Sequence, residues 1–444
     1  MEKYDLFVIG TGSAGFAAAE ECRKQGLRVA IADKLPFGGT CALRGCNPKR
    51  LMSGATEILN RASHMKGRGV EGSVIIDWPK LIDFTKDIIQ AAQNHSETLP
   101  EQLGIEKYHG ICRFTGENSL LVGDTEIQAD RIVIATGSAP AHLGIPGEEH
   151  INTSDTFFEL QDLPKRILFV GGGYISFELA HIAAWAGARV EIVEVRDTVL
   201  ANFDQNLVKM FLDVCEKEGI SVYTSSPIHS IERSGNEYRV HAGERKITTD
   251  LIIHGAGRVP ETADLNLEKG NVKTGPRGII ANQFLQSESN PSVYIAGDVN
   301  PNSVQLTTVA EMEGDIVAHN LLYGNSKVPD YNPIASTVFS FPQLSSAGLT
   351  ESQARQQGID FDAQFINTSD RHITRRLGLT HSGFKVLTDR DTGAIIGAHL
   401  LGHNCDEVIN VMLMAISARM TVGELKKMRF TFPTVMHDLC MRLG

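Results

Sequence analysis

Short runs of consecutive apolar residues alternate with longer amphipathic segments along the chain up to about residue 330. Such a run predicts a strand buried on both faces, as in a parallel sheet, and the longer segments between runs predict crossover helices. The predicted buried strands cover residues 6–9, 27–32, 132–136, 167–170, 188–193 and 293–295. The predicted helices cover residues 16–25, 48–64, 79–101 and 177–186. This order predicts two successive α/β units.

The pattern changes after about residue 330. Residues 338–349, 384–389 and 395–401 alternate or run apolar in the manner of antiparallel strands. Residues 405–419 and 422–427 have the spacing of helices. We therefore predict a third domain of α+β type at the C-terminal end.

Composition limits the classes of partner. With 444 residues, of which 42% are hydrophobic, the chain is too long for one ordinary core and can hold a cofactor-sized cleft. Its formal net charge of -11 and the lack of a Lys/Arg run argue against nucleic acid or an anionic membrane as the main partner and favour a small molecule. The N-terminal residues lead directly into a strand, and no apolar run reaches the length of a membrane span. We expect a soluble cytoplasmic protein.

The first α/β unit carries a dinucleotide fingerprint. The strand at residues 6–9 is followed by Gly10, Gly12 and Gly15 in the spacing G-x-G-x-x-G, and the next strand is followed by Asp33. The glycines allow a tight turn and a close approach to a pyrophosphate, and the acid accepts hydrogen bonds from ribose hydroxyls.

A second fingerprint follows the strand at residues 167–170. Gly171 and Gly173 begin its phosphate loop, Ser176 takes the third glycine position, and Glu194 ends the next strand. A carboxylate there pairs with a 2′-hydroxyl and repels a 2′-phosphate, which favours NADH over NADPH. Arg196 favours NADPH instead, since a guanidinium could hold the 2′-phosphate. Two sites predict two nucleotide cofactors and a hydride relay between them.

The segment 38–49 contains Cys41 and Cys46 at the predicted start of a helix, a few residues after Asp33. A helix N-terminus favours the thiolate form, so the pair is typical of a dithiol/disulfide redox centre. A zinc site would need two more ligands at matching spacing, and a structural disulfide is rare in the cytosol. Four other cysteines fall in or beside apolar segments and are expected to be buried thiols: Cys22, Cys112, Cys215 and Cys405.

Taken in order, these motifs resemble the FAD-dependent pyridine nucleotide-disulfide oxidoreductases, such as glutathione reductase, dihydrolipoamide dehydrogenase and mercuric reductase. The resemblance covers the chain from Tyr4 to about Leu439. It implies two Rossmann-like dinucleotide-binding domains, for FAD and NAD(P), and a C-terminal α+β dimerisation domain. The implied boundaries are 1–145 and 266–330 for the FAD domain, 146–265 for the NAD(P) domain and 331–444 for the interface domain.

The resemblance also implies residue roles. Cys46 would face the flavin as the charge-transfer thiolate and Cys41 would be the interchange thiol. Lys49 and Glu178 match the ion pair of the family near the flavin N5, and Tyr174 matches its ring at the nicotinamide pocket. The remaining positions implied to bind cofactor are Gly39, Thr40, Thr136, Gly137, Arg258 of the G-R-x-P motif and Asp298, which would hold the ribityl chain. Members are homodimers in which each active site is completed by the partner.

One segment departs from the family pattern. The family carries a His and, five residues later, a Glu that together protonate the leaving thiolate, whereas this chain has Phe432 and His437 at those positions. The same pair occurs in 2-ketopropyl-coenzyme M oxidoreductase/carboxylase, where an apolar site favours carboxylation of an enolate over its protonation. There are two alternatives. The pair arose by sequence drift in an enzyme whose substrate supplies its own proton, or His437 itself protonates the leaving group from a shifted position. Arg44 is a second departure: it either favours the thiolate or points to solvent.

These observations predict an enzyme that passes electrons from NAD(P)H through FAD to the Cys41–Cys46 disulfide and on to a small sulfur-containing substrate, a disulfide or thioether. The alternatives are reductive C–S cleavage with carboxylation, metal-ion reduction, and a non-catalytic flavoprotein that senses redox state. Cys440 is single, so it does not reproduce the C-terminal cysteine pair of mercuric reductase, and a buried thiol is expected there. No resident metal is predicted.

Overall fold

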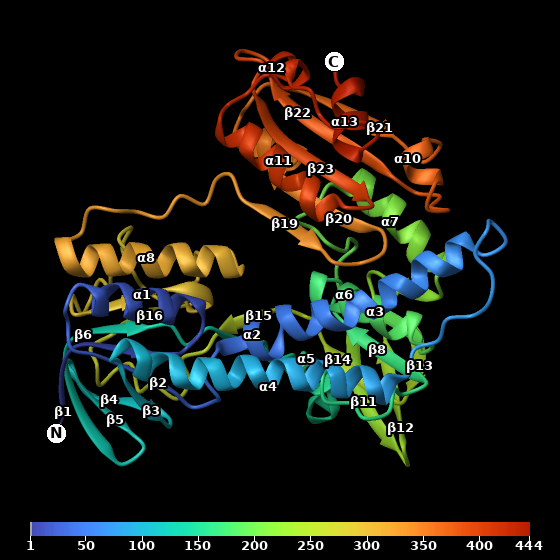
Figure 1. The fold of residues 1–444 in the computed structure, drawn as a ribbon. Helices are drawn as coiled ribbons and strands as arrows, with labels where there is room; N and C mark the ends of the chain where they lie inside the picture. The colour runs from blue at the N-terminus through green and yellow to red at the C-terminus, as the bar shows by residue number, and fades with distance from the viewer. Residues whose placement is uncertain (1) are drawn as a thin grey trace. The chain divides into compact units, whose positions relative to one another are not determined.

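The computed structural model describes residues 2–444 as two compact units. Within the described residues, unit 1 comprises residues 2–48, 83–141 and 257–331, and unit 2 comprises residues 49–82, 142–256 and 332–444. Two long helices contribute residues to both units: α3 (Cys46–Met65) divides after Pro48, and α4 (Trp78–Leu103) divides after Ile82. Figure 1 shows the helices and strands of both units, coloured along the chain.

Unit 1 is built on a mostly parallel sheet. β1 (Glu2–Ile9) lies between β2 (Val29–Asp33) and β6 (Thr125–Ile134), with Ile9 opposite Ala32 and Ile134. The further strands of this sheet are β3 (Glu106–His109), β4 (Cys112–Gly116), β5 (Ser119–Val122) and β18 (Val293–Ile295). β5 pairs antiparallel with the first half of β6, and β18 pairs parallel with its second half. The C-terminal ends of the parallel strands β1, β2, β6 and β18 therefore lie at the same edge of the sheet.

Two helices of unit 1 approach each other closely. α1 (Ser13–Lys24) packs on α8 (Thr307–Tyr323), and a Cβ at Gly314 would lie 2.5 Å from the Ala14 carbonyl oxygen (Figure 1). Only glycine allows this crossing, which fixes the N-terminal half of α8 against α1. The remaining elements of unit 1 are α2 (Gly39–Arg44), β7 (Ser138–Pro140), β15 (Arg258–Pro260), β16 (Thr274–Gly275), β17 (Gly278–Ile279) and η2 (Gly297–Val299).

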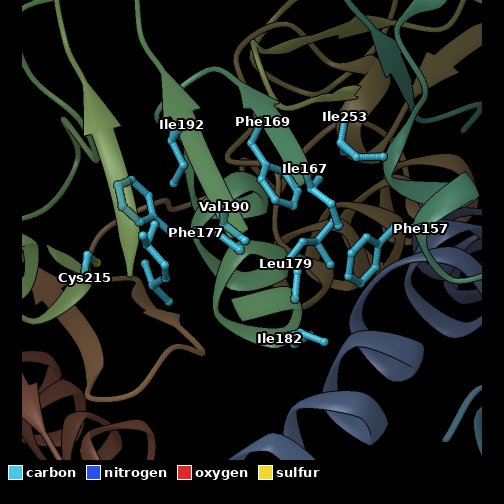
Figure 2. Packing of buried hydrophobic residues seen from close by; sticks show 14 of the residues in the cluster. Phe157, Ile167, Phe169, Phe177, Leu179, Ile182, Val190, Ile192, Cys215 and Ile253 are labelled. Atoms are coloured by element: carbon cyan, nitrogen blue, oxygen red, sulfur yellow. The ribbon is translucent and has the colours of Figure 1, made fainter. Parts of the chain in front are cut away.

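Unit 2 contains a second parallel sheet, in the order β10, β9, β8, β14. Its core gathers side chains from the strands and from α6 (Tyr174–Trp185), with Phe157, Phe169 and Phe177 fully buried (Figure 2). The strands are β8 (Arg166–Val170), β9 (Arg189–Val193), β10 (Ile220–Tyr223) and β14 (Leu251–His254). Unit 2 also contains a three-stranded antiparallel sheet of β11 (Ile228–Ser234), β12 (Glu237–Ala242) and β13 (Arg245–Thr249). Its further helices in this region are η1 (Glu148–His150), α5 (Ser154–Phe157) and α7 (Gln205–Lys217).

The C-terminal part of unit 2 is an antiparallel sheet covered by α11 (Cys405–Ser417). Its five strands, in spatial order, are β19 (Ala335–Val338), β20 (Gln343–Gly348), β23 (Ile395–Gly402), β22 (Gly383–Asp389) and β21 (Phe361–Asn367). The short helices are α9 (Glu351–Gln356), α10 (His372–Arg375), α12 (Val422–Lys427) and α13 (Val435–Arg442).

A buried ion-pair cluster joins the two parts of unit 2. Lys385 on β22 contacts Asp204, which caps the N-terminus of α7, at 2.7 Å, and Glu351 of α9 at 2.6 Å. Its third donor bonds Asn206. All three ammonium protons therefore have acceptors, which is the condition for a stable buried lysine.

The predicted α/β fold with a C-terminal α+β domain is confirmed. The runs at residues 6–9, 167–170 and 293–295 lie in β1, β8 and β18, and residues 422–427 form α12 as predicted. One prediction is wrong: residues 338–349 are not a single strand. Residues 339–342 separate β19 from β20, because Pro342 has no N–H to donate to a ladder.

Candidate functional site

The first phosphate loop connects β1 to α1 in unit 1. Gly10 has φ +109, and a Cβ there would lie 2.2 Å from the Ala135 carbonyl oxygen. A Cβ at Gly15 would lie 2.0 Å from the carbonyl oxygen of Gly10, while Gly12 is the N-cap of α1. Gly10 and Gly15 are therefore required by the backbone itself, and the loop presents the N-terminus of a 12-residue helix.

The strand-end acid of unit 1 is bonded to this loop. Oδ2 of Asp33 accepts hydrogen bonds from the backbone N–H of Thr11 at 2.9 Å and from its hydroxyl at 2.8 Å, and Oδ1 accepts from the Leu35 N–H at 2.9 Å. A Cβ at Gly39, at the start of α2, would lie 2.5 Å from the Cα of Gly12. The first phosphate loop and the start of the cysteine segment thus touch.

Unit 2 repeats the same arrangement. Gly171 has φ +102, and a Cβ there would lie 2.3 Å from the Gly255 carbonyl oxygen, while Gly173 is the N-cap of α6. Oε2 of Glu194 accepts a hydrogen bond from the Gly172 N–H at 2.6 Å, and Oε1 accepts from the Arg196 N–H at 2.8 Å. In both units one carboxylate oxygen holds the middle residue of G-x-G and the other holds the residue two places after the acid.

A hydrogen-bond chain in unit 1 connects Arg258 to Asp298. Nε of Arg258 donates to the Ser138 hydroxyl at 2.9 Å, and that hydroxyl donates to Oδ2 of Asp298 at 3.1 Å. Burial raises the pKa of Asp298, and the Ser138 hydrogen bond and the Arg258 charge partly offset this. Thr136, beside Gly137 (φ +74), donates its hydroxyl to the carbonyl oxygen of Glu261 at 2.6 Å. The contacts of Ser138 hold β7, which follows β6, against η2, which contains Asp298.

The two cysteines of unit 1 share one hydroxyl. Cys41 lies within α2, next to Thr40, and Cys46 is the first residue of α3. The hydroxyl of Thr307, the first residue of α8, donates to Sγ of Cys41 at 2.9 Å and lies 3.6 Å from Sγ of Cys46. Both cysteines are half-buried, and both sulfurs lie within 3.6 Å of the same hydroxyl oxygen.

Unit 2 contains a buried ion pair beside an aromatic ring. Nζ of Lys49 lies 2.8 Å from Oε2 of Glu178, with side chains 13% and 2% exposed. Oε1 of Glu178 accepts a hydrogen bond from the Phe339 N–H at 2.9 Å. Nζ of Lys49 lies 5.1 Å and Cζ of Arg50 4.2 Å from the centroid of the Phe339 ring, as in cation–π contacts. Phe339 therefore orients the carboxylate and covers the lysine.

The C-terminal pair is also brought together in unit 2. The ring of Phe432 meets that of His437 edge to face, with centroids 5.0 Å apart, and lies 6.3 Å from that of His372. Phe432 is 67% exposed, and Tyr174, the first residue of α6, is 40% exposed.

The other cysteines are buried, as predicted for Cys22, Cys112, Cys215 and Cys405 and for Cys440. Burial raises the pKa of Cys22 and of Cys112 to about 12 and that of Cys440 to about 11, so these thiols are unreactive at neutral pH. Residues 2–444 contain no cluster of three or more His, Cys, Asp or Glu side chains arranged to hold a metal ion. Across the same residues, no helix combines the length and apolar character needed to span a membrane.

The residues present fit two nucleotides. In each unit a glycine turn whose Cβ positions are filled by backbone precedes a helix N-terminus, and a carboxylate fixes that turn. Helix N-termini with such turns bind pyrophosphate, and the strand-end acid lies where a ribose would bind. A dithiol next to the first turn adds a two-electron acceptor. This set of sites defines a nucleotide-dependent dithiol oxidoreductase.

The chain belongs to the pyridine nucleotide-disulphide oxidoreductase family: the model of that family matches residues 4–314, and the model of its dimerisation domain matches residues 334–439. The chain is accordingly a flavoprotein oxidoreductase that uses FAD and a pyridine nucleotide and has a disulfide redox centre. The match to the dimerisation domain fits a homodimer.

Relatives cover nearly the whole chain. Glutathione reductase of Nostoc sp. is 32% identical over 448 residues, covering 96% of this chain and 95% of the relative. Mercuric reductase of Staphylococcus aureus is 30% identical over 433 residues, covering 95% of this chain and 78% of the relative. Among solved structures, the Cu(II) complex of the HOCl-induced flavoprotein disulfide reductase RclA from Escherichia coli has a TM-score of 0.90 at 26% identity, with 100% of both chains covered.

Three contacts of these sites were not predicted from the sequence: Thr307 on the cysteines, Ser138 between Arg258 and Asp298, and Phe339 on Glu178. Each comes from a segment far along the chain from its partner. The one available signal was position, since Ser138 directly follows the predicted pair Thr136 and Gly137.

Proposed function

We propose that the enzyme passes electrons from a reduced nicotinamide to the Cys41–Cys46 pair and on to a small sulfur-containing acceptor. FAD, when bound, accepts the hydride and delivers two electrons to the disulfide. The observation that carries the proposal is that both sulfurs contact the Thr307 hydroxyl within the unit that holds the first phosphate loop. In this proposal Cys46 faces the flavin and Cys41 meets the acceptor.

The other predicted residues keep proposed roles. The FAD ligands are proposed to be Gly10, Gly12, Gly15, Asp33, Gly39, Thr40, Thr136, Gly137 and Asp298. The nicotinamide nucleotide is proposed to lie at Gly171, Gly173, Tyr174 and Glu194, and Arg258 of unit 1 is proposed as a further cofactor-binding residue. We also propose the domain limits 1–145 with 266–330, 146–265 and 331–444, and a homodimer formed through the last of these. Size-exclusion chromatography with light scattering measures the mass of the protein in solution and tests the dimer. A monomeric mass would contradict it.

An anaerobic titration tests the electron path. Addition of NADH to the FAD-loaded protein should produce a long-wavelength band from a thiolate in contact with oxidised flavin. Cys46→Ser should abolish this band, whereas Cys41→Ser, which keeps the flavin-facing thiol, should retain it. A band that survives Cys46→Ser contradicts the assignment, and negligible NADH oxidation with every acceptor would instead favour a redox sensor.

For the nicotinamide we propose NADH. The support is Glu194, whose carboxylate is fixed by two backbone N–H groups and so presents a negative charge where a 2′-phosphate would have to bind. The ratio of kcat/KM for NADH and NADPH measures this preference. A ratio that favours NADPH contradicts the proposal and would assign the phosphate to Arg196.

The acceptor is proposed to be a low-molecular-weight disulfide or thioether. A screen of small disulfides and thioethers, each with and without bicarbonate, identifies the class. Stimulation by bicarbonate would instead favour reductive C–S cleavage with carboxylation, for which the support is the pairing of Phe432 with His437.

A thiophilic metal ion is a second candidate acceptor. The observation that favours it is Phe432: a ring cannot donate a proton, and a metal ion bound by thiolates needs none. Relatives named mercuric reductase and a Cu(II) complex of RclA add support. NADH oxidation driven by Hg(II) or Cu(II), and lost in Cys41→Ser, would establish this activity. Oxidation that is equal in the variant would reflect direct reaction of the metal with flavin.

A further inference from the structure

The Thr307 hydroxyl lies between the two redox sulfurs but does not treat them equally. It donates a hydrogen bond to Sγ of Cys41 at 2.9 Å, whereas its distance to Sγ of Cys46 is 3.6 Å. The sulfur that it bonds is the one that the proposed function assigns to the acceptor.

The surroundings favour negative charge at this position. Cys46 begins the 20-residue α3 and Thr307 begins the 17-residue α8, so two helix N-termini converge on the sulfurs. None of α2, α3 and α8 has an acidic residue in its first turn. The charged residue that lies between the two cysteines in sequence is cationic, Arg44.

We propose that Thr307 is a catalytic residue that stabilises the thiolate of Cys41 by hydrogen bonding. The inference rests on the proposed function. It explains how Cys41 can act as a nucleophile although the position of the family's histidine is occupied by Phe432. The charge on sulfur is stabilised in place by a hydroxyl that keeps its own proton.

The chemistry balances without a further reagent. Two electrons, supplied from the nicotinamide, break the Cys41–Cys46 bond, and the one proton taken up is shared between the two sulfurs. With the proton on Cys41, Cys46 is the thiolate that faces the flavin; with the proton on Cys46, Cys41 is the nucleophile. The Cys41 thiolate attacks one sulfur of an acceptor disulfide, forming a mixed disulfide and releasing the other sulfur as a thiolate, which takes a proton from solvent. Cys46, on losing its proton, then attacks Cys41, restores the Cys41–Cys46 bond and releases the second acceptor thiol.

The chain offers a direct way to measure the two sulfurs separately. Trypsin cleaves after Arg44, so Cys41 lies on the peptide of residues 35–44 and Cys46 on that of residues 45–49. The dithiothreitol-reduced, FAD-loaded protein is treated briefly with iodoacetamide at neutral pH, and mass spectrometry of these peptides gives an alkylation rate for each cysteine.

Thr307→Val removes the hydroxyl at nearly constant shape. Loss of one hydrogen bond to a charged acceptor lowers the thiolate population by about tenfold. Because a less stabilised thiolate is also more nucleophilic, the alkylation rate of Cys41 should fall by about threefold. The rate of Cys46 should change less. Thr307→Ser keeps a hydroxyl and should therefore retain the alkylation rate of Cys41. Thr308→Val, at the exposed neighbouring residue, is the control and should change neither alkylation rate.

Equal changes at the two cysteines, no change, or failure of Thr307→Ser to recover the rate would overturn the proposal. Should Thr307→Val not fold, Thr307→Ala in the same assay decides. The experiment needs no turnover, so it is independent of the NADH titration: loss of the proposed electron path would leave the alkylation rates as they are.

Discussion

Removal of Lys49 leaves a carboxylate buried without its charge partner. Lys49→Met deletes the ammonium 2.8 Å from Glu178, whose side chain is 2% exposed, and leaves only the Phe339 N–H as a donor to it. Breaking a buried pair from one side costs about 3–5 kcal/mol, because the remaining charge stays desolvated. Unit 2 should therefore unfold at a temperature lower by roughly 6–20 °C.

The measurement is thermal unfolding followed by circular dichroism, with hydrogen exchange at the Phe339 amide as a local readout. Lys49→Met/Glu178→Gln removes both charges and keeps an oxygen for the Phe339 N–H, so it should recover most of the loss. Lys80→Met is a matched control: Lys80 also lies 2.8 Å from its partner, Asp77, but the two side chains are 84% and 49% exposed. Its expected cost is below about 1 kcal/mol.

Two results would refute this reasoning. If Lys49→Met costs no more than Lys80→Met, burial does not set the value of the pair. If the double variant is no more stable than Lys49→Met, the loss does not come from an unpaired carboxylate. In the second case Lys49 would contribute through its packing against Phe339.

Three further outcomes are expected. Phe432→His with His437→Glu restores a general acid, so it should raise the rate with a small disulfide by about a hundredfold over either single variant. If the rate rises with none of the disulfides tested, the idea that Phe432 prevents protonation in the active site is contradicted. Glu194→Gln should shift the kcat/KM ratio toward NADPH by about tenfold, measured with both nucleotides, and an unchanged ratio would remove Glu194 from specificity. Lys385 holds the pKa of Glu351 below its usual 4.5, so this stability is present above that pH and is lost as the pH falls below it. Lys385→Met should therefore show a shallower loss of stability on acidification, and an equally steep one would contradict the linkage.

The fold was predictable where the signal is local and strong. The buried strands of both parallel sheets are apolar at successive positions, so β1 and β8 could be placed from the sequence alone. The antiparallel strands β11 and β12 could not, because only Ile231, Val240 and Ala242 among their residues are buried and their pattern is that of a polar loop.

The same distinction applies to the candidate site. Glycine turns and strand-end acids lie within one stretch of sequence, so Gly10 and Asp33 could be assigned a nucleotide role before the structure. The Thr307 hydroxyl meets Cys41 across 266 positions along the chain, and threonine at a helix start has a common capping use. Only the three-dimensional arrangement distinguishes the two roles.

The carboxylates of Asp33 and Glu194 hold their glycine turns by hydrogen bonds to the backbone of the protein itself. Each turn is therefore braced by groups of the chain, so little conformational entropy would be lost if a nucleotide bound there as proposed. The rate of binding at such a rigid turn should depend on diffusion and charge and not on loop folding. Because each unit has its own such carboxylate, the two proposed nucleotide affinities should respond separately to substitutions around one acid at a time.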